Sequence, residues 1–157
     1  MRTLLVALSL VLATAGSSAA ETAEEIVAWY NGYIQLWRDA NNVDIDAMAG
    51  YFAAPRYAVG ADGVAQLLAT KEMNRARLVA GVENLKKRGW ARSEARAKAQ
   101  MLNSGVALIE TEWTSYDSDG KPIGACRPTA GLFSYLAAKT KEGWKILSSH
   151  VGPCKTP

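Results

Sequence analysis

The sequence predicts an α+β fold in which N-terminal helices cover one face of a curved antiparallel sheet. Three observations predict it. Aromatic and aliphatic residues recur at spacings of three and four from Ile26 to Trp37, which is the period of an amphipathic helix. After Gly89 the pattern changes to alternation, which is the period of a strand. The turn residues Asn103–Gly105 then separate two alternating segments that can pair as a hairpin.

Residues 1–20 have the organisation of a secretory signal peptide. Arg2 supplies a positive charge, an apolar run follows, and small residues lead to a cleavage site after Ala20. The apolar run is about ten residues long and too short to span a bilayer, although a retained anchor is the alternative. We therefore expect a periplasmic or secreted protein with no membrane contact after cleavage. Residues 21–157 are long enough for one domain with one core.

Charge and composition exclude several classes of partner and cofactor. The formal net charge is only +3, which is too small to predict binding to nucleic acid. The basic run at 86–88 lies where a helix is expected to end, so it compensates the helix dipole. Two cysteines and one histidine without metal-ligand spacing do not form a conventional zinc site, so we expect no metal and no cofactor.

Capping residues indicate where the first two helices begin. Thr22 and Glu25 form a capping box at the start of the first helix, and Asn41–Asn42 ends it. A second, shorter helix is expected over residues 43–52, with Pro55 as its stop. Its inward side is predicted to carry Ile45, Met48 and either Tyr51 or Phe52.

A short β-hairpin and a third helix are expected next. Residues 56–59 read as a strand, GADG at 60–63 as a turn, and VAQLL as the partner strand. Thr70 is the expected N-cap of the third helix, and Gly89 its end. The predicted buried side of that helix consists of Met73, Ala76, Val79, Val82 and Leu85.

The segment ARSEARAKAQML, residues 91–102, satisfies two patterns. Its alanines also align on one face of a helix, and its composition favours a helix. A hairpin folded about Ser104 instead satisfies both faces of a sheet at once. It places Lys98 opposite Glu110 and Arg96 opposite Glu112 on one face, and the alanines opposite Ile109, Thr111 and Trp113 on the other. We predict a strand, with the charges on a solvated outer face.

The C-terminal part of the chain is expected to add two more antiparallel strands. A long strand from Ile123 to Lys139, interrupted at Pro128 and Gly131, is predicted to pair with WKILSSHV. The expected register pairs Leu136 with Trp144, Ser134 with Ile146, Leu132 with Ser148 and Ala130 with His150, and places Cys126 opposite Cys154. In an exported protein these cysteines can form a disulfide, with two free thiols as the alternative.

Three motifs, in this order, resemble the nuclear transport factor 2-like superfamily, which includes ketosteroid isomerases and SnoaL-like polyketide cyclases. They are YIQLWRDANNVDIDAMAGYF at 33–52, GADG at 60–63 and EGWKILSSHV at 142–151. The resemblance covers nearly all of residues 21–157. It implies a cone-shaped half barrel of curved sheet around the N-terminal helices, with a pocket at its open end. Many members of the superfamily form dimers through the sheet.

The resemblance allows isomerase chemistry to be tested against the residues present. Such a reaction needs a carboxylate base and acidic donors that hold an enolate oxygen. Tyr33 could match the oxyanion tyrosine of the family. The base is expected near Tyr57 or Ala58, and neither is a carboxylate, whereas Asp62 belongs to a turn where Asp usually bonds to its own backbone. The residues therefore do not support isomerase activity.

Five residues form the candidate ligand-binding site: Tyr30, Tyr33, Thr111, Trp113 and His150. His150, assigned to the inward face, and Tyr33 are also the candidate catalytic pair. Each of the five has a structural alternative, because the same side chains can simply fill or bond within the core. The absence of a catalytic carboxylate favours a domain that binds a small hydrophobic ligand without catalysis. An isomerase, dehydratase or cyclase-like lyase and a homodimeric interaction module that uses the outer face of the sheet are the alternatives.

Overall fold

The computed structural model describes residues 22–124, 126 and 130–154. The predicted signal peptide and Pro128 lie outside these residues. The elements are α1 (Ala23–Gln35), α2 (Ile45–Gly50), β1 (Phe52–Val59), β2 (Ala65–Leu68), α3 (Lys71–Lys87), β3 (Arg92–Asn103), β4 (Val106–Tyr116), β5 (Gly131–Thr140) and β6 (Gly143–Cys154).

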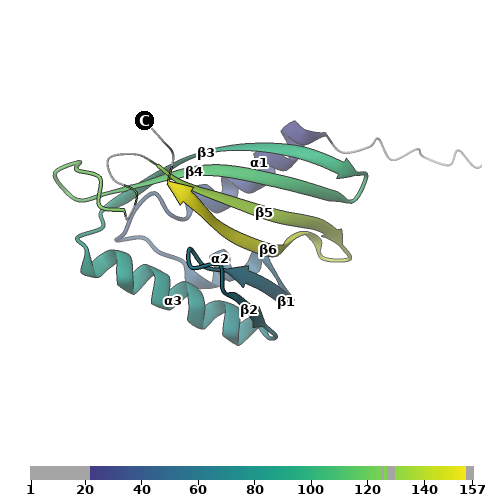
Figure 1. Cartoon of the computed structure of the whole chain (residues 1–157), viewed down its shortest axis with the longest axis horizontal. Coiled ribbons are helices and arrows are strands. Elements are labelled where there is room, and N and C mark those ends of the chain that lie inside the picture. The colour runs from purple at the N-terminus through teal and green to yellow at the C-terminus, as the bar shows by residue number, and fades with distance from the viewer. Residues whose placement is uncertain (1–21, 125, 127–129, 155–157) are drawn as a thin grey trace, which may run out of the picture.

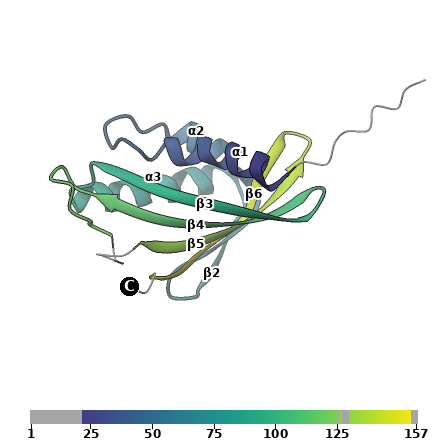
Figure 2. The same cartoon turned by 90° about the horizontal axis from the view of Figure 1, so that it is seen from above.

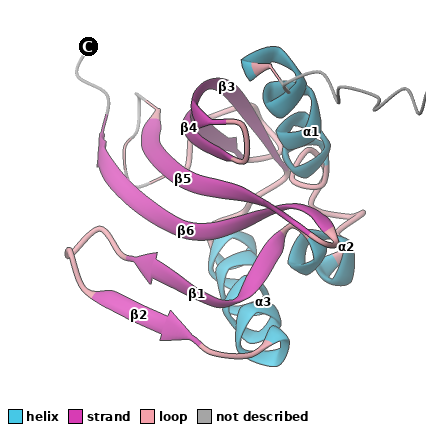
Figure 3. Cartoon of the chain, turned by 90° about the vertical axis from the view of Figure 1, so that its right-hand side faces the viewer, coloured by secondary structure: helices cyan, strands magenta, loops and turns pink. Residues whose placement is uncertain are grey.

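The strands form one curved, unclosed sheet in the order β2-β1-β6-β5-β4-β3 (Figure 1). Strands β3 to β6 form the expected antiparallel meander. One pair is different, because β1 runs parallel to β6. The three helices lie on the same side of the strands, as Figure 2 shows from above. Figure 3 shows the sheet bending around them. The predicted α+β half barrel around N-terminal helices is confirmed.

Helix α1 begins and packs as its sequence predicts. The Thr22 hydroxyl accepts a hydrogen bond from the Glu25 N–H at 3.3 Å, and the Glu25 carboxylate accepts one from the Thr22 N–H at 2.7 Å. This capping box satisfies N–H groups that the first turn of a helix leaves without partners. The apolar face of the helix is buried against the concave side of the sheet, through Ile26, Tyr30, Tyr33 and Ile34.

Helix α2 ends earlier than expected, and Pro55 does not end it. Asp44 caps the helix by accepting from the Ala47 N–H at 2.8 Å, and Met48 is completely buried. The helix ends at Gly50, and Phe52 already begins β1. Pro55 lies within that strand, between the two residues where the register with β6 shifts, Phe52 and Tyr57. A ladder that is interrupted there tolerates a residue that has no N–H to donate.

Helix α3 buries Val82 as predicted, but the rest of its buried face differs from the predicted one. Thr70 is its N-cap and Gly89, with φ 83°, follows its C-terminal end, as expected. The buried side chains are Asn74, Leu78 and Val82, whereas Met73 and Ala76 are exposed. The apolar residues of α3 are spread around the helix, so they specify its rotation weakly. The hydrogen bonds of Asn74, described below, hold the polar side chain in the interior.

The segment from Arg92 to Asn103 is a strand, and its register with β4 is the predicted one. Lys98 lies opposite Glu110, and the two side chains form an ion pair at 2.9 Å on the outer face. The alanines at 95, 97 and 99 face inward and pack against the core. Because these side chains are small, α1 can lie directly over β3.

The register of β5 and β6 differs from the expected one. The hairpin closes more tightly, since Thr140 pairs with Gly143, so Leu136 lies opposite Ser148 rather than Trp144. All five pairs predicted between these strands are wrong. The pairs of Leu136, Ser134 and Leu132 fail because of this shift, and those of Ala130 and Cys126 because β5 begins only at Gly131. A bulge between Ile146 and Ser148 adds a second change, because one extra residue reverses the alternation of the strand. Trp144 and Ile146 face inward as expected, but His150 does not.

The predicted disulfide joins Cys126 and Cys154, whose Cα atoms are 5.0 Å apart. The two residues are not ladder partners, because Cys154 lies opposite Gly131 at the start of β5. Cys126 instead comes from the segment before that strand. Within the part of the chain that is described, no helix is long and apolar enough to cross a membrane.

Candidate functional site

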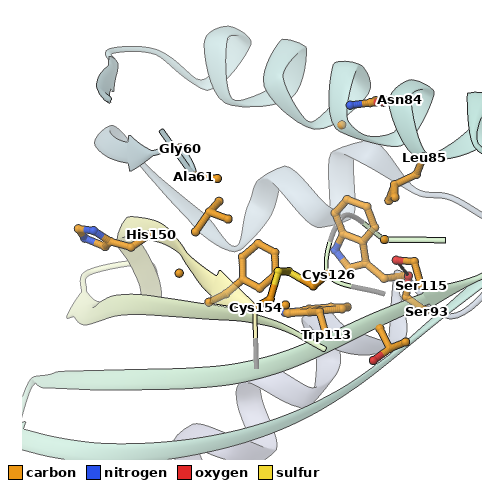
Figure 4. Close-up of a pocket in the computed structure, with 18 of the residues that line it drawn as sticks. Gly60, Ala61, Asn84, Leu85, Ser93, Trp113, Ser115, Cys126, His150 and Cys154 are labelled. Carbon is orange, nitrogen blue, oxygen red and sulfur yellow. Dashed lines mark hydrogen bonds between the residues drawn. A yellow bond between two sulfur atoms is a disulfide. The ribbon is translucent and has the colours of Figure 1, made fainter. Parts of the chain in front are cut away.

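A cavity of about 980 Å³ lies between α3 and the concave face of the sheet. Its walls come from α1, α3, the turn after β1, and the inner faces of β4, β5 and β6. Figure 4 shows Trp113 and the disulfide near the middle of the site, with Gly60 and Ala61 toward one end and Ser93 and Ser115 toward the other.

Aromatic side chains form the floor of the cavity. Tyr33 reaches it from α1, Trp37 from the turn after α1, Trp113 from β4, and Phe133 and Tyr135 from β5. The rings of Tyr33, Trp37 and Trp113 are mutual neighbours, with centroids 6.1 to 6.3 Å apart. Such packing fixes the rings and gives the cavity a rigid apolar floor.

A backbone hydrogen bond from β3 positions Trp37, which follows the C-terminal end of α1. The carbonyl of Trp37 accepts a hydrogen bond from the Ser93 N–H at 3.1 Å. The hydroxyl of Ser93 in turn lies 2.8 Å from that of Ser115 and accepts from the Trp90 indole N–H at 2.9 Å. This end of the cavity therefore combines an indole ring with hydroxyl groups that already have partners.

Three of the five predicted ligand-binding residues line the cavity, and two do not. Tyr33, Trp113 and His150 are part of the lining. Tyr30 and Thr111 lie deeper, in the core behind it, where both are almost completely buried. Their hydroxyl oxygens make no hydrogen bond with the described residues.

His150 is at the edge of the site and not in its interior. Its pairing partner Ser134 and the exposed side chain both place it on the outer face of the sheet, because Ser149 and Val151 take the inward positions after the bulge. Figure 4 shows its imidazole pointing away from the other labelled side chains. Tyr33 lies on the concave side, so the two side chains face different sides of the sheet although both residues contribute to the lining.

The phenols near the cavity are held in their protonated form. Burial raises the pKa of Tyr30 and of Tyr33 far above the ordinary value, and the neighbouring Tyr135 acts in the same direction. Burial also raises the pKa of Tyr135 to about 12. These groups can donate hydrogen bonds at neutral pH, but they do not act as bases.

A buried guanidinium next to this cluster was missed by sequence reasoning. Arg56 in β1 is only 3% exposed, and its Nε donates to the Asn74 side-chain oxygen at 2.5 Å. Its Nη1 donates to the Ser149 hydroxyl at 2.9 Å, and the group lies 4.0 Å above the ring of Phe52. Burial lowers the pKa of Arg56 to about 10, and the charge of Arg77 acts in the same direction.

No carboxylate is found among the described residues that line the cavity, whereas Arg77 and Arg88 are. Ala58 occupies the inward position of β1 and Tyr57 the outward one, so neither supplies a base. The Asp62 carboxylate accepts from the Val64 N–H at 3.0 Å within its own turn, as expected. The described residues also contain no group of three or more potential metal ligands.

The comparisons with known proteins agree with the fold. The family model described as NTF2-like protein (DUF6841) matches residues 23–154. No curated protein matches the chain.

Several solved structures share the fold at low sequence identity. A domain of unknown function with a cystatin-like fold from Nostoc punctiforme is 20% identical, with a TM-score of 0.64, over 85% of this chain and 77% of that one. An NTF2-like protein from Shewanella oneidensis is 19% identical, with a TM-score of 0.60, over 83% and 98%. A ketosteroid isomerase-like protein from Erwinia carotovora atroseptica is 15% identical, with a TM-score of 0.57, over 86% and 95%.

Proposed function

The chain belongs to the NTF2-like family DUF6841, and we propose that it binds a small hydrophobic molecule in the cavity beneath α3. The fold of the family does not by itself fix an activity, so the support for the proposal comes from the cavity. The observation that carries this proposal is the character of the lining. The floor is aromatic, and no carboxylate is present among the described lining residues. The volume of about 980 Å³ is within the range that binds small organic ligands.

Gly81 gives the sharpest test of this proposal. It belongs to α3 and lines the cavity, and a Cβ atom added there would meet nothing within 4 Å. A tryptophan at this position therefore has room to fold and occupies space that a ligand needs. We expect Gly81→Trp to weaken binding of a neutral fluorescent probe such as Nile red by about tenfold or more, since it removes most of the contact area.

Gly50→Trp is the matched control. Gly50 lies at the end of α2, away from the cavity lining, and a Cβ atom there also meets nothing within 4 Å. It should leave the probe affinity unchanged. Equal binding to the wild type and to Gly81→Trp would reject the cavity as the site. Failure of the wild type to bind any neutral hydrophobic probe would reject the proposed function.

An isomerase or lyase reaction through His150 and Tyr33 has less support. A shared proton transfer needs both groups within hydrogen-bonding reach of one substrate, and the exposed His150 side chain lies on the opposite face of the sheet from Tyr33. His150 is the only histidine in the chain. A reaction through this residue would therefore be abolished by His150→Gln, and an isomerase or lyase turnover that His150→Gln leaves unchanged would reject it.

A homodimer through the outer face of the sheet is a second candidate role. Leu108 and Leu136 pair across β4 and β5 on that face, and both are only half-buried. Partly exposed leucines paired on the outer face of the sheet give a second copy an apolar surface to contact. Sedimentation equilibrium should give a dimer that Leu136→Lys converts to a monomer, and a wild-type monomer would reject this role.

Export is a separate part of the proposed function, because it depends on residues 1–20 and not on the cavity. The experiment is expression of the full chain in a bacterium with a periplasm, followed by N-terminal sequencing of the mature protein. The mature chain should begin at Glu21. A cytoplasmic product that still begins at Met1 would reject export.

A further inference from the structure

Positive charge gathers around the cavity without a matching negative charge. Arg77 and Arg88 lie in its wall, and the described lining contains no Asp or Glu. Arg77 is half-buried, and its Nη1 donates to the Gln66 side-chain oxygen at 2.7 Å. The remaining N–H groups of this guanidinium make no hydrogen bond with the described residues.

Arg56 adds a buried charge close to Arg77. Its partners Asn74 and Ser149 are neutral acceptors, and no carboxylate of the described residues forms an ion pair with it. A buried guanidinium normally requires an opposite charge, because desolvation without one is costly. The ring of Phe52 compensates only part of that cost.

Three acidic side chains on the surrounding elements have partners of their own. Asp46 forms an ion pair with Arg75 at 2.8 Å, and Glu110 pairs with Lys98 on the outer face of the sheet. Asp62 bonds within its own turn. These groups therefore do not neutralise Arg77 in the cavity wall, or Arg56, which lies near the lining residues Tyr33 and Tyr135.

We propose that the hydrophobic molecule carries an anionic oxygen group, in the simplest case a carboxylate, that binds the free N–H groups of Arg77. The buried charge of Arg56 strengthens this binding, and the aromatic floor takes the apolar body of the ligand. This inference rests on the proposed function and names its ligand class. An arginine fork suits a carboxylate because both oxygens can accept hydrogen bonds.

The test compares two ligands of nearly equal shape, naphthaleneacetate and naphthaleneacetamide, by isothermal titration calorimetry. A second pair, decanoate and decanamide, covers a flexible apolar body. The carboxylate of at least one pair should bind about tenfold or more tightly than its amide, as expected of a hydrogen bond to a charged group. Arg77→Gln should remove that preference by weakening the binding of the carboxylate to about the affinity of the amide.

Arg75→Gln is the matched control, since Arg75 lies on the same helix, pairs with Asp46 and does not line the cavity. It should keep the preference for the carboxylate. Equal affinity for acid and amide in the wild type, or an unchanged preference in Arg77→Gln, would overturn the anionic ligand class while leaving the proposed function intact. If none of the four ligands bound, this inference would be overturned. The failure of Nile red to bind would separately overturn the proposed function.

Discussion

Asn74 is the residue that makes a charged side chain tolerable in the interior. Its side-chain oxygen accepts from Arg56 and its amide donates to the Ala53 carbonyl at 2.8 Å. Asn74→Ala should lower the free energy of unfolding by about 3 kcal/mol, because a buried charged donor loses its acceptor. Urea denaturation measures this value. Arg75→Ala on the exposed side of the same helix should cost less than about 1 kcal/mol, and an equally small effect of Asn74→Ala would contradict the buried network.

Gly81 limits the stability of α3. It lies within the helix, has an ordinary negative φ, and has open space where a Cβ atom would be added. Gly81→Ala should therefore raise the free energy of unfolding by about 0.5 to 1 kcal/mol, since it restricts the unfolded chain without a clash. Gly63→Ala is the contrasting variant, because the φ of Gly63 is 77° and an alanine there is strained. A destabilised Gly81→Ala protein would show that the open space is filled.

Periodicity finds some residues of the site and misses others for a physical reason. Tyr33 and Trp113 could be predicted because apolar residues repeat with the period of their element, and burial follows that period. Arg56 and Arg77 could not, because an arginine in a sequence reads as exposed until its neighbours in space are known. His150 was placed on the wrong face because no residue type near Leu147 marks the bulge.

At the scale of the element, the N-terminal cap of α3 separates stability from binding. The Thr70 hydroxyl accepts from the Met73 N–H at 3.3 Å, and this first turn lies outside the cavity lining. Thr70→Ala should cost about 1 kcal/mol of stability and leave Nile red affinity unchanged. Thr70→Ser keeps the acceptor oxygen and should retain most of that stability. A loss of affinity in Thr70→Ala would mean that fraying reaches Arg77.

Strand pairing was predictable where both faces of a hairpin carry information. Opposite charges on one face and small apolar residues on the other fix the register of β3 and β4, because any one-residue slip spoils both. The outer face of β5 and β6 carries serines and leucines without such complementary pairs, so it does not distinguish one register from the next. The buried face of α3 was mispredicted on similar grounds, since its only strong determinant is the hydrogen bonding of Asn74.

At the scale of the whole molecule, the buried phenols should control stability in alkali. The pKa values of Tyr30, Tyr33 and Tyr135 are raised in the folded protein, so these groups stay protonated where the unfolded chain has begun to ionise. The unfolded state then binds fewer protons, and stability falls as pH rises above about 10. Arg56 acts in the opposite direction, because its pKa is lowered and the unfolded state holds its proton longer.

The three phenols oppose the one guanidinium, so from about one pH unit above pH 10 the unfolded state binds about two fewer protons than the folded state. The slope there is about 3 kcal/mol per pH unit. Urea midpoints measured across this range should fall steeply, and tyrosinate absorbance from the buried rings should appear only as the near-ultraviolet circular dichroism is lost. Tyr135→Phe removes one of the three phenols, which leaves a net difference of about one proton and should flatten the slope by about half. If all the tyrosines ionised reversibly near pH 10 in a protein that stayed folded, the aromatic floor would be open to water. The cavity would then lack the dry apolar surface that a hydrophobic ligand needs.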